Sequence, residues 1–152
     1  MEELKEYRRR FLEKLAAAPQ ELCLAVAALP DAFAPLEEGG WNAHQVVVHL
    51  RDVNEHIYPP RLYRILAEEN PLLESFDSDT WMAAHYNAAE PLEALLDEFS
   101  RQCAEVAARL RDIPAEAWNR PGTHPSLGTH PLQWWAERML AHIEEHLAQL
   151  KT

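Results

Sequence analysis

The stretch that decides the fold is residues 132–150, LQWWAERMLAHIEEHLAQL. Its apolar side chains and two histidines recur every three or four residues, which is the spacing of one face of an α-helix. That face consists of Trp135, Met139, His142, Ile143, His146 and Leu150. Charged side chains fall largely outside it, at Glu137, Arg138, Glu144, Glu145 and Lys151. We therefore predict an amphipathic helix that turns both histidines toward a protein core.

A second apolar stripe precedes it at residues 91–112, which we predict to be a helix. The stripe consists of Leu92, Leu95, Leu96, Phe99, Cys103, Val106 and Leu110. Residues 43–69 also have helical spacing, and Asn42 is suited to be their N-cap. Because proline lacks a backbone N–H, the pair Pro59-Pro60 must kink this helix.

The first helix is predicted at residues 2–29. Pro30 ends it, and Pro19 bends or restarts it because Pro-Gln-Glu resembles a first helical turn. Segments rich in Pro, Gly or Asp connect the helices, at residues 31–40, 70–90 and 113–131. The connection at 70–90 includes a short helix near Asp79, and such long connections predict at least one crossover between helices.

Length and composition agree with one domain. The chain has 152 residues, of which 47% are hydrophobic, enough to bury a core without disulfides. The only run of β-branched residues, Val46-Val47-Val48, lies within a helical pattern. We therefore predict an all-α fold, a four-helix bundle with long connecting loops, as a single domain over residues 1–152.

Charge and composition argue against several classes of partner. The net charge of −11, from 25 acidic and 14 basic residues, would repel a nucleic-acid backbone. No stretch approaches the roughly 18 unbroken apolar residues of a membrane helix, and residues 1–5 lack the features of a secretory signal. We expect a cytoplasmic protein without membrane contact. Cys23 and Cys103, 80 residues apart, are predicted to be buried, reduced thiols.

Three of the eight histidines suggest a metal site. His142 and His146 are four residues apart, so their Cβ atoms lie about 5–6 Å apart on one helix face. That spacing alone is weak evidence, since chance gives roughly 0.4 such pairs in this chain. His49 lies in the apolar stripe of the second helix, where a lone imidazole is usually a hydrogen-bonded core residue. Three inward-facing imidazoles on packed helices are more simply explained by one shared divalent ion.

The other histidines are weaker candidates. His56 lies two turns beyond His49 and is a rival ligand, although the proline pair leaves its direction open. His44 is expected to be exposed near the start of its helix. The remaining three are expected in loops, at His85, His124 and His130, and His124 could line the mouth of a pocket.

Short motifs outside the helical stripes carry a family resemblance. They are residues 41–52 (WNAHQVVVHLRD), Arg61-Leu62, Asn70-Pro71, Phe76-Asp77 ahead of Trp81, His124-Pro125 and residues 142–150 (HIEEHLAQL). Together they resemble the DinB/YfiT-like metalloenzymes, the YfiT branch especially. The resemblance implies a four-helix bundle, commonly a homodimer, with one divalent metal on His49, His142 and His146. Characterised relatives include thiol-dependent transferases that use bacillithiol or mycothiol, and a thiol-dependent isomerase. Where the YfiT branch often has a further histidine, this chain has Asn54.

These observations predict a metal-dependent enzyme that acts on small electrophilic molecules. It would be a thiol-dependent S-transferase or a hydrolase, and a non-catalytic metal-binding or stress-response protein is the alternative. Three imidazoles with an open position suit zinc or nickel, while manganese and iron also fit the donors. Asp52 would orient the bound thiol or water, or else be a surface or capping carboxylate. Arg61 would pair with an anionic thiol, with Trp134 and Trp135 shaping the pocket. The alternative is that Arg61 forms an ion pair and the two tryptophans belong to the ordinary core.

Overall fold

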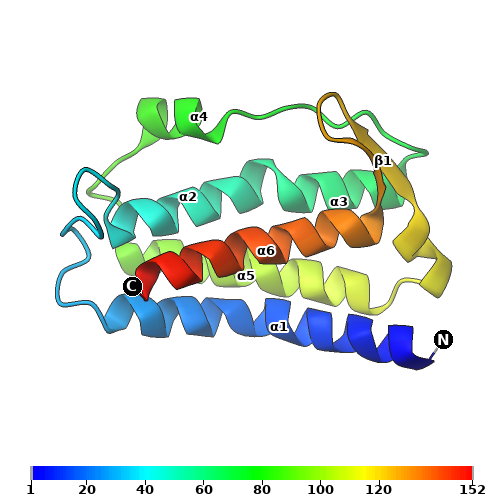
Figure 1. Ribbon diagram of the computed structural model, residues 1–152, viewed down its shortest axis with the longest axis horizontal. Helices are drawn as coiled ribbons and strands as arrows, with labels where there is room; N and C mark the ends of the chain where they lie inside the picture. The colour runs from blue at the N-terminus through cyan, green and yellow to red at the C-terminus, as the bar shows by residue number, and fades with distance from the viewer. Residues whose placement is uncertain (1, 152) are drawn as a thin grey trace.

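The computed structural model describes residues 2–151 and shows a four-helix bundle (Figure 1). Its elements are α1 (Glu2–Ala27), α2 (Ala43–His56), α3 (Tyr58–Ala67), α4 (Ser78–His85), α5 (Leu92–Arg111), the 3-10 helix η1 (Ala115–Asn119), β1 (Pro121–His124), β2 (Gly128–Pro131) and α6 (Leu132–Leu150). Helices α2 and α3 follow one another end to end and together occupy one position in the bundle. α1 packs against α5 and α6, α2 against α5, and α3 against α6. The predicted fold class is confirmed.

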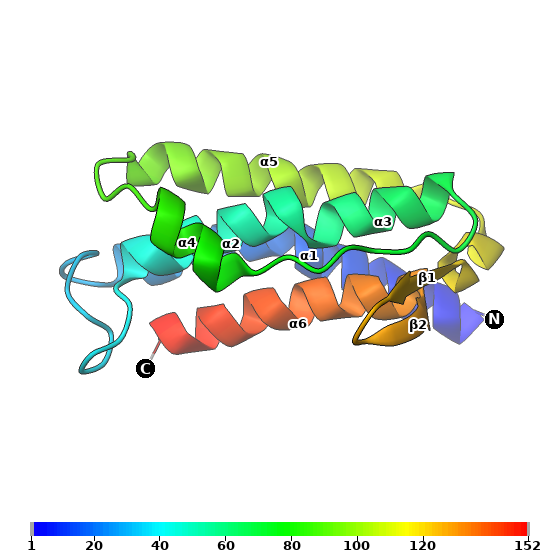
Figure 2. The ribbon, with the colours of Figure 1, turned by 90° about the horizontal axis from the view of Figure 1, so that it is seen from above.

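The order of the helices requires a crossover, as predicted. The combined α2–α3 and the following α5 run in the same direction, and α1 and α6 run the opposite way (Figures 1 and 2). Residues 68–77 therefore travel back along the bundle before α4 and α5 begin. This return places α4 beside α2.

The predicted second helix is two helices in the structure. Asn42 caps α2 through a capping box, in which its side chain accepts from the backbone N–H of Gln45 and the Gln45 side chain accepts from the backbone N–H of Asn42. α2 ends at His56, because Pro59 and Pro60 have no N–H to donate to the preceding turn. The same prolines occupy the first turn of α3, where a missing N–H costs nothing.

α1 continues through Pro19 without restarting, so only the bend remains as a prediction there, and the helix ends at Ala27, close to the predicted Leu29. One prediction about the remaining segments was wrong. Residues 113–131 are not a plain loop, because they contain η1 and an antiparallel hairpin of β1 and β2. The returning chain adds to this hairpin, since the Leu73 N–H donates to the Thr123 carbonyl at 2.7 Å.

Gly122 in β1 shows how tightly the hairpin lies on α3. A Cβ atom at this position would come within 2.7 Å of the Ile65 side chain. The hairpin thus packs directly against the end of the bundle that α3 and the start of α6 form. Because the hairpin also pairs with Leu73, it fixes the position at which residues 68–77 leave this end of the bundle.

The core lies between the four helix positions. Most of the α5 stripe is buried as predicted, with Phe99 and Cys103 fully inaccessible to solvent, whereas Leu92 and Leu96 are only half-buried. Both cysteines are unbonded thiols, but Cys23 is only half-buried. Burial raises the pKa of the Cys103 thiol to about 12, so it stays protonated. Within residues 2–151, no helix has both the length and the apolar character needed to cross a membrane.

Candidate metal centre

Three histidines that are far apart in sequence meet between α2 and α6. His49 lies on α2, and His142 and His146 lie on consecutive turns of α6. The ring centroids are separated by 5.1 Å for His49 and His142, 4.9 Å for His49 and His146, and 4.7 Å for His142 and His146. One nitrogen from each ring lies within 4.8 Å of the other two. We call these residues the histidine group.

The shortest approach in this group joins two ring nitrogens of the same kind. The Nε2 atoms of His49 and His142 are 3.1 Å apart. Around an ion with metal–nitrogen bonds of about 2.1 Å, neighbouring donors are spaced about 3.0 to 3.4 Å, so this pair already has a suitable separation. The widest separation of 4.8 Å exceeds that spacing. A modest ring rotation would bring all three donors to one ion.

The orientation of His146 is set by a neighbour on its own helix. Its Nδ1 lies 2.8 Å from Oε1 of Gln149. An amide oxygen only accepts hydrogen bonds, so Nδ1 carries the proton and Nε2 keeps a free lone pair. This is the arrangement in which a second side chain orients a metal-binding imidazole.

Burial keeps two of the rings uncharged. The His49 side chain is almost fully enclosed and packs against Trp41 at 5.1 Å. Burial is the main cause that lowers the pKa of His49 to about 4, and it also lowers the pKa of His142 to about 3. The positive charge that His146 would carry adds to both effects. Neutral imidazoles are the form that binds a metal, so these rings need no deprotonation at neutral pH.

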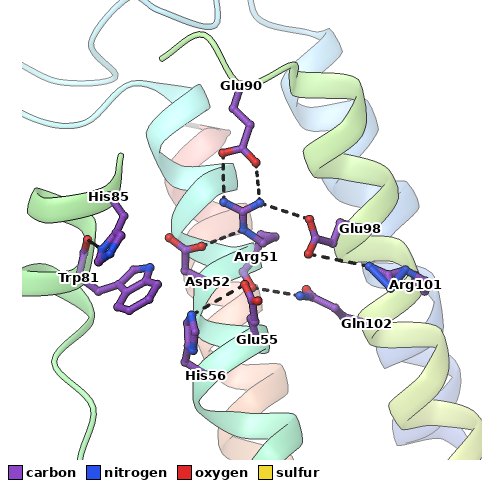
Figure 3. Close-up of polar contacts among 10 residues, drawn as sticks. All are labelled: Arg51, Asp52, Glu55, His56, Trp81, His85, Glu90, Glu98, Arg101 and Gln102. Carbon is purple, nitrogen blue, oxygen red and sulfur yellow. Dashed lines mark hydrogen bonds and ion pairs between the residues drawn. The ribbon is translucent and has the colours of Figure 1, made fainter. Parts of the chain in front are cut away.

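Asp52 does not join the histidine group. Its Oδ1 accepts a hydrogen bond from Arg51 at 2.8 Å, and Arg51 also pairs with Glu90 and Glu98 (Figure 3). The carboxylate is buried, so the alternative of a surface or capping group is wrong. Burial raises the pKa of Asp52, while its hydrogen bond to Arg51 lowers it. Its predicted catalytic role stays a prediction.

His56 also lies outside the group. It stacks on Phe76 at 4.8 Å and contacts Trp81 at 4.4 Å. Figure 3 shows it on α2 facing Trp81 of α4. The rival-ligand interpretation of His56 is therefore wrong. The ring instead helps hold α4 against α2.

Sequence reasoning missed Asp79 on α4. Its negative charge favours the protonated form of His49, which places this carboxylate within electrostatic reach of the histidine group. It stands in the first turn of the short helix that Asp77 caps. The proximity arises from the return of the chain over α2, a long-range contact that spacing along the sequence does not reveal.

The other histidines differ from the sequence expectation. His44 was predicted to be exposed, but only 1% of it is accessible, because Nδ1 bonds the Tyr86 hydroxyl and Nε2 bonds the Glu90 carbonyl. His85 ends α4 instead of lying in a loop. His124 and His130 belong to β1 and β2, and His124 is buried.

Arg61 lies on α3 and packs on Trp135 of α6. Its guanidinium carbon is 5.6 Å from the Trp135 ring centroid, and Nη2 donates to the Glu74 carbonyl at 3.1 Å. Trp135 is a fully buried core residue, and Trp134 is half-buried beside it at 4.8 Å. Arg61 does not form the ion pair that was the alternative, since no carboxylate among the described residues 2–151 pairs with it.

The sequence profile of the DinB superfamily matches residues 3–150. The chain belongs to this superfamily. Its fold is similar to the solved structure of YfiT from Bacillus subtilis, with a TM-score of 0.86, 24% identity, and coverage of 95% of this chain and 84% of that one. That protein is described as a probable metal-dependent hydrolase with an unusual four-helix bundle topology.

Curated relatives agree with the superfamily assignment. A Bacillus licheniformis protein is 32% identical over 149 residues, covering 90% of this chain and 83% of that relative. An Oceanobacillus iheyensis protein is 30% identical over 112 residues, covering 69% of this chain and 64% of that relative. Both have the provisional name of a metal-dependent hydrolase.

Proposed function

We propose that this protein is a metal-dependent enzyme whose ion is held by His49, His142 and His146. The single observation that carries the proposal is the meeting of three ring nitrogens within 4.8 Å. Two further features support it: the neutral state of the buried rings and the orientation of His146 by Gln149. The provisional names of the relatives point the same way.

Three imidazoles suit zinc or nickel best, although manganese and iron remain compatible. Such an ion, when bound, acts as a Lewis acid and lowers the pKa of a coordinated water or thiol. The protein's part is to hold the three donors in place and to limit access of water. His49 is the buried member of the three, while His142 and His146 are half-buried, so a small molecule would reach the ion from their side.

Hydrolysis of a small electrophilic molecule is the reaction class we favour. Thiol-dependent S-transfer is its variant, with a low-molecular-weight thiol as co-substrate in place of water. Asp52 lies one turn after His49 and is our candidate for orienting the attacking group, while Arg61 would pair with an anionic group of the thiol or substrate.

Metal analysis followed by activity assays tests this proposal. Purified protein should contain close to one divalent ion per chain, and His146→Ala should lose it. His85→Ala is the matched control, because His85 is exposed and lies outside the histidine group. Hydrolysis of activated esters and amides, and consumption of thiol in the presence of electrophiles, should follow the metal content.

The assay also separates the proposal from its alternative. Stoichiometric metal with neither hydrolysis nor thiol consumption would favour a non-catalytic metal-binding or stress-response protein. Protein that takes up no zinc or nickel after chelator treatment and dialysis against either ion would contradict both the metal-dependent enzyme and the non-catalytic metal-binding protein. We further propose a cytoplasmic homodimer, which light scattering on the eluted protein would check for oligomeric state.

A further inference from the structure

A groove lies between α1, the end of α5 and η1. Its volume is about 560 Å³, within the range of about 300–1,000 Å³ that is usual for small-molecule sites. Apolar side chains from these elements and from the turn between α5 and η1 line it: Leu12, Ala16, Leu110, Ile113 and Trp118. A hollow of this size and lining can enclose most of a small apolar molecule, because removal of apolar surface from water favours binding.

The rim of the groove is positively charged, although the chain as a whole is acidic. Four cationic side chains line it: Lys5, Arg8, Arg9 and Arg111. Among the described residues, Glu13 is the one carboxylate in the lining, and it pairs with Arg9, as does Glu6. No carboxylate within residues 2–151 pairs with the other three cations. Since the chain has a net charge of −11, the groove is a local concentration of positive charge that attracts an anion.

Arg8 is the buried cation of this lining. It is 9% exposed, and its guanidinium carbon lies 5.1 Å from the Trp118 ring centroid. Its Nε donates to Oε1 of Gln133 at 2.9 Å, and Nη1 has a long contact of 3.4 Å with the Ala115 carbonyl. Nη2 has no acceptor within residues 2–151 and is not fully enclosed. Nη1 and Nη2 form the outer edge of the guanidinium, which matches the two oxygens of one carboxylate.

The lack of a carboxylate partner alone does not mark a binding site. Arg120 has none among the described residues, yet its Nε and Nη2 donate to the carbonyls of Ile65 and Glu68 at 2.8 and 2.6 Å. Arg109 is exposed, with its guanidinium carbon 4.5 Å from the ring centroid of Tyr63. Arg8 differs from both, because it is buried, retains an unused donor and lines an apolar groove.

The groove and the histidine group belong to different ends of the bundle. α1 begins and α5 ends at one end, whereas α6 ends at the opposite end (Figures 1 and 2). His142 and His146 lie in the second half of α6. Binding in the groove therefore does not depend on the metal centre or on the proposed function.

We propose that this groove binds an aliphatic monocarboxylate, as a second ligand site of the protein. The carboxylate contacts the outer edge of Arg8, and Lys5 and Arg111 add positive charge at the rim. The aliphatic chain packs on the apolar lining around Leu12 and Trp118. Because the ligand must match both the charge and the apolar surface, neither a small anion nor an aliphatic cation fits this groove.

Calorimetric titration with octanoate tests the site on the protein as purified. Octanoate should bind, and hexanoate should bind roughly ten- to fifteen-fold more weakly, because two fewer methylenes are buried. Acetate carries the charge without the chain, and octylammonium carries the chain with the opposite charge. Neither should bind measurably at concentrations that saturate the groove with octanoate.

Ala16→Trp is the variant that blocks the groove. Ala16 is exposed and belongs to the lining, so the larger ring fills the groove without entering the core. Ala17→Trp is the matched control, because Ala17 is the next residue, is equally exposed and is not part of the lining. Octanoate binding should be lost in Ala16→Trp and unchanged in Ala17→Trp.

Arg8→Gln tests the charged end of the site. It should bind octanoate roughly ten- to a hundred-fold more weakly, the effect of losing a charged hydrogen bond. Arg109→Gln removes the same charge outside the groove and should bind octanoate as the native protein does. Circular dichroism checks that each variant is folded, and Ala16→Trp keeps the test decisive if Arg8→Gln is not.

Loss of binding in Ala16→Trp and Arg8→Gln, with binding kept in both controls, supports the site. Absence of octanoate binding to the native protein, full binding by Ala16→Trp, or equal losses in a variant and its control would overturn it. A groove covered by a second copy of the chain would show itself in light scattering, because Ala16→Trp alone would change the oligomeric state while the native protein took up no octanoate. All four variants should keep the native metal content, so failure of this site and failure of the metal proposal give different results.

Discussion

Replacing Gln149 is the sharpest test of how the proposed metal centre is held. Its Oε1 accepts the proton of His146 Nδ1 at 2.8 Å, which fixes both the tautomer and the direction of the ring. In Gln149→Leu that acceptor is lost, while the three imidazoles remain. Loss of a partner that orients a ligand typically weakens metal affinity about 10- to 100-fold, which corresponds to about 1.4 to 2.7 kcal/mol.

The assay is competition for zinc or nickel against a chromophoric chelator, with circular dichroism to confirm that each variant is folded. Gln133→Leu is the matched control, because Gln133 is a half-buried glutamine on the same helix whose Oε1 serves Arg8 instead. It should leave metal affinity unchanged. Gln149→Glu should retain or increase the affinity, since a carboxylate is a stronger acceptor for the Nδ1 proton.

A folded Gln149→Leu variant that binds the ion as tightly as the native protein would refute the role of this hydrogen bond. Equal weakening of binding in both leucine variants would refute it too, because the effect would then not depend on His146. Either result would mean that packing of α6, rather than the hydrogen bond, orients the ring.

Three further predictions concern the fold and its acid stability. Phe99→Ala should lower the free energy of unfolding by about 3–5 kcal/mol in urea titrations, because Phe99 is fully buried in the core. Asn42→Ala should cost about 1 kcal/mol in the same measurement, from loss of the α2 cap. The hydrogen bond from Arg51 lowers the pKa of Glu90 below its usual 4.5, so this pair stabilises the fold above that pH and the contribution is lost as pH falls through the lowered pKa. Glu90→Gln should therefore flatten the loss of stability below about pH 4.5 in acid titrations followed by circular dichroism.

The parts predictable from sequence are those fixed by contacts within one helix. The α5 stripe around Phe99 follows from a 3.6-residue period, and the Asn42 cap from a local hydrogen-bonding pattern. The histidine group was predictable because two independent constraints coincide. His142 and His146 share one helix face, and His49 lies in the apolar stripe of a second helix.

The parts that could not be predicted depend on contacts between distant segments. β1 and β2 have four residues each, with Thr as their only β-branched residue, so they lack the alternation that marks a strand. Pairing of Leu73 with Thr123 stabilises them from another part of the chain. His44 becomes buried because residues 86–90 fold back onto it. Neither contact produces a periodic pattern in the sequence around Thr123 or His44, so neither could be predicted from that sequence.

The break between α2 and α3 allows both the histidine group and Arg61 to face α6. In one continuous helix, His49 and Arg61 would point about 120° apart, because twelve residues at 100° each leave that remainder. Both nevertheless contact α6, His49 through His142 and Arg61 through Trp135. The irregular backbone at Ile57, which the proline pair enforces, lets α2 and α3 each turn a different face toward α6.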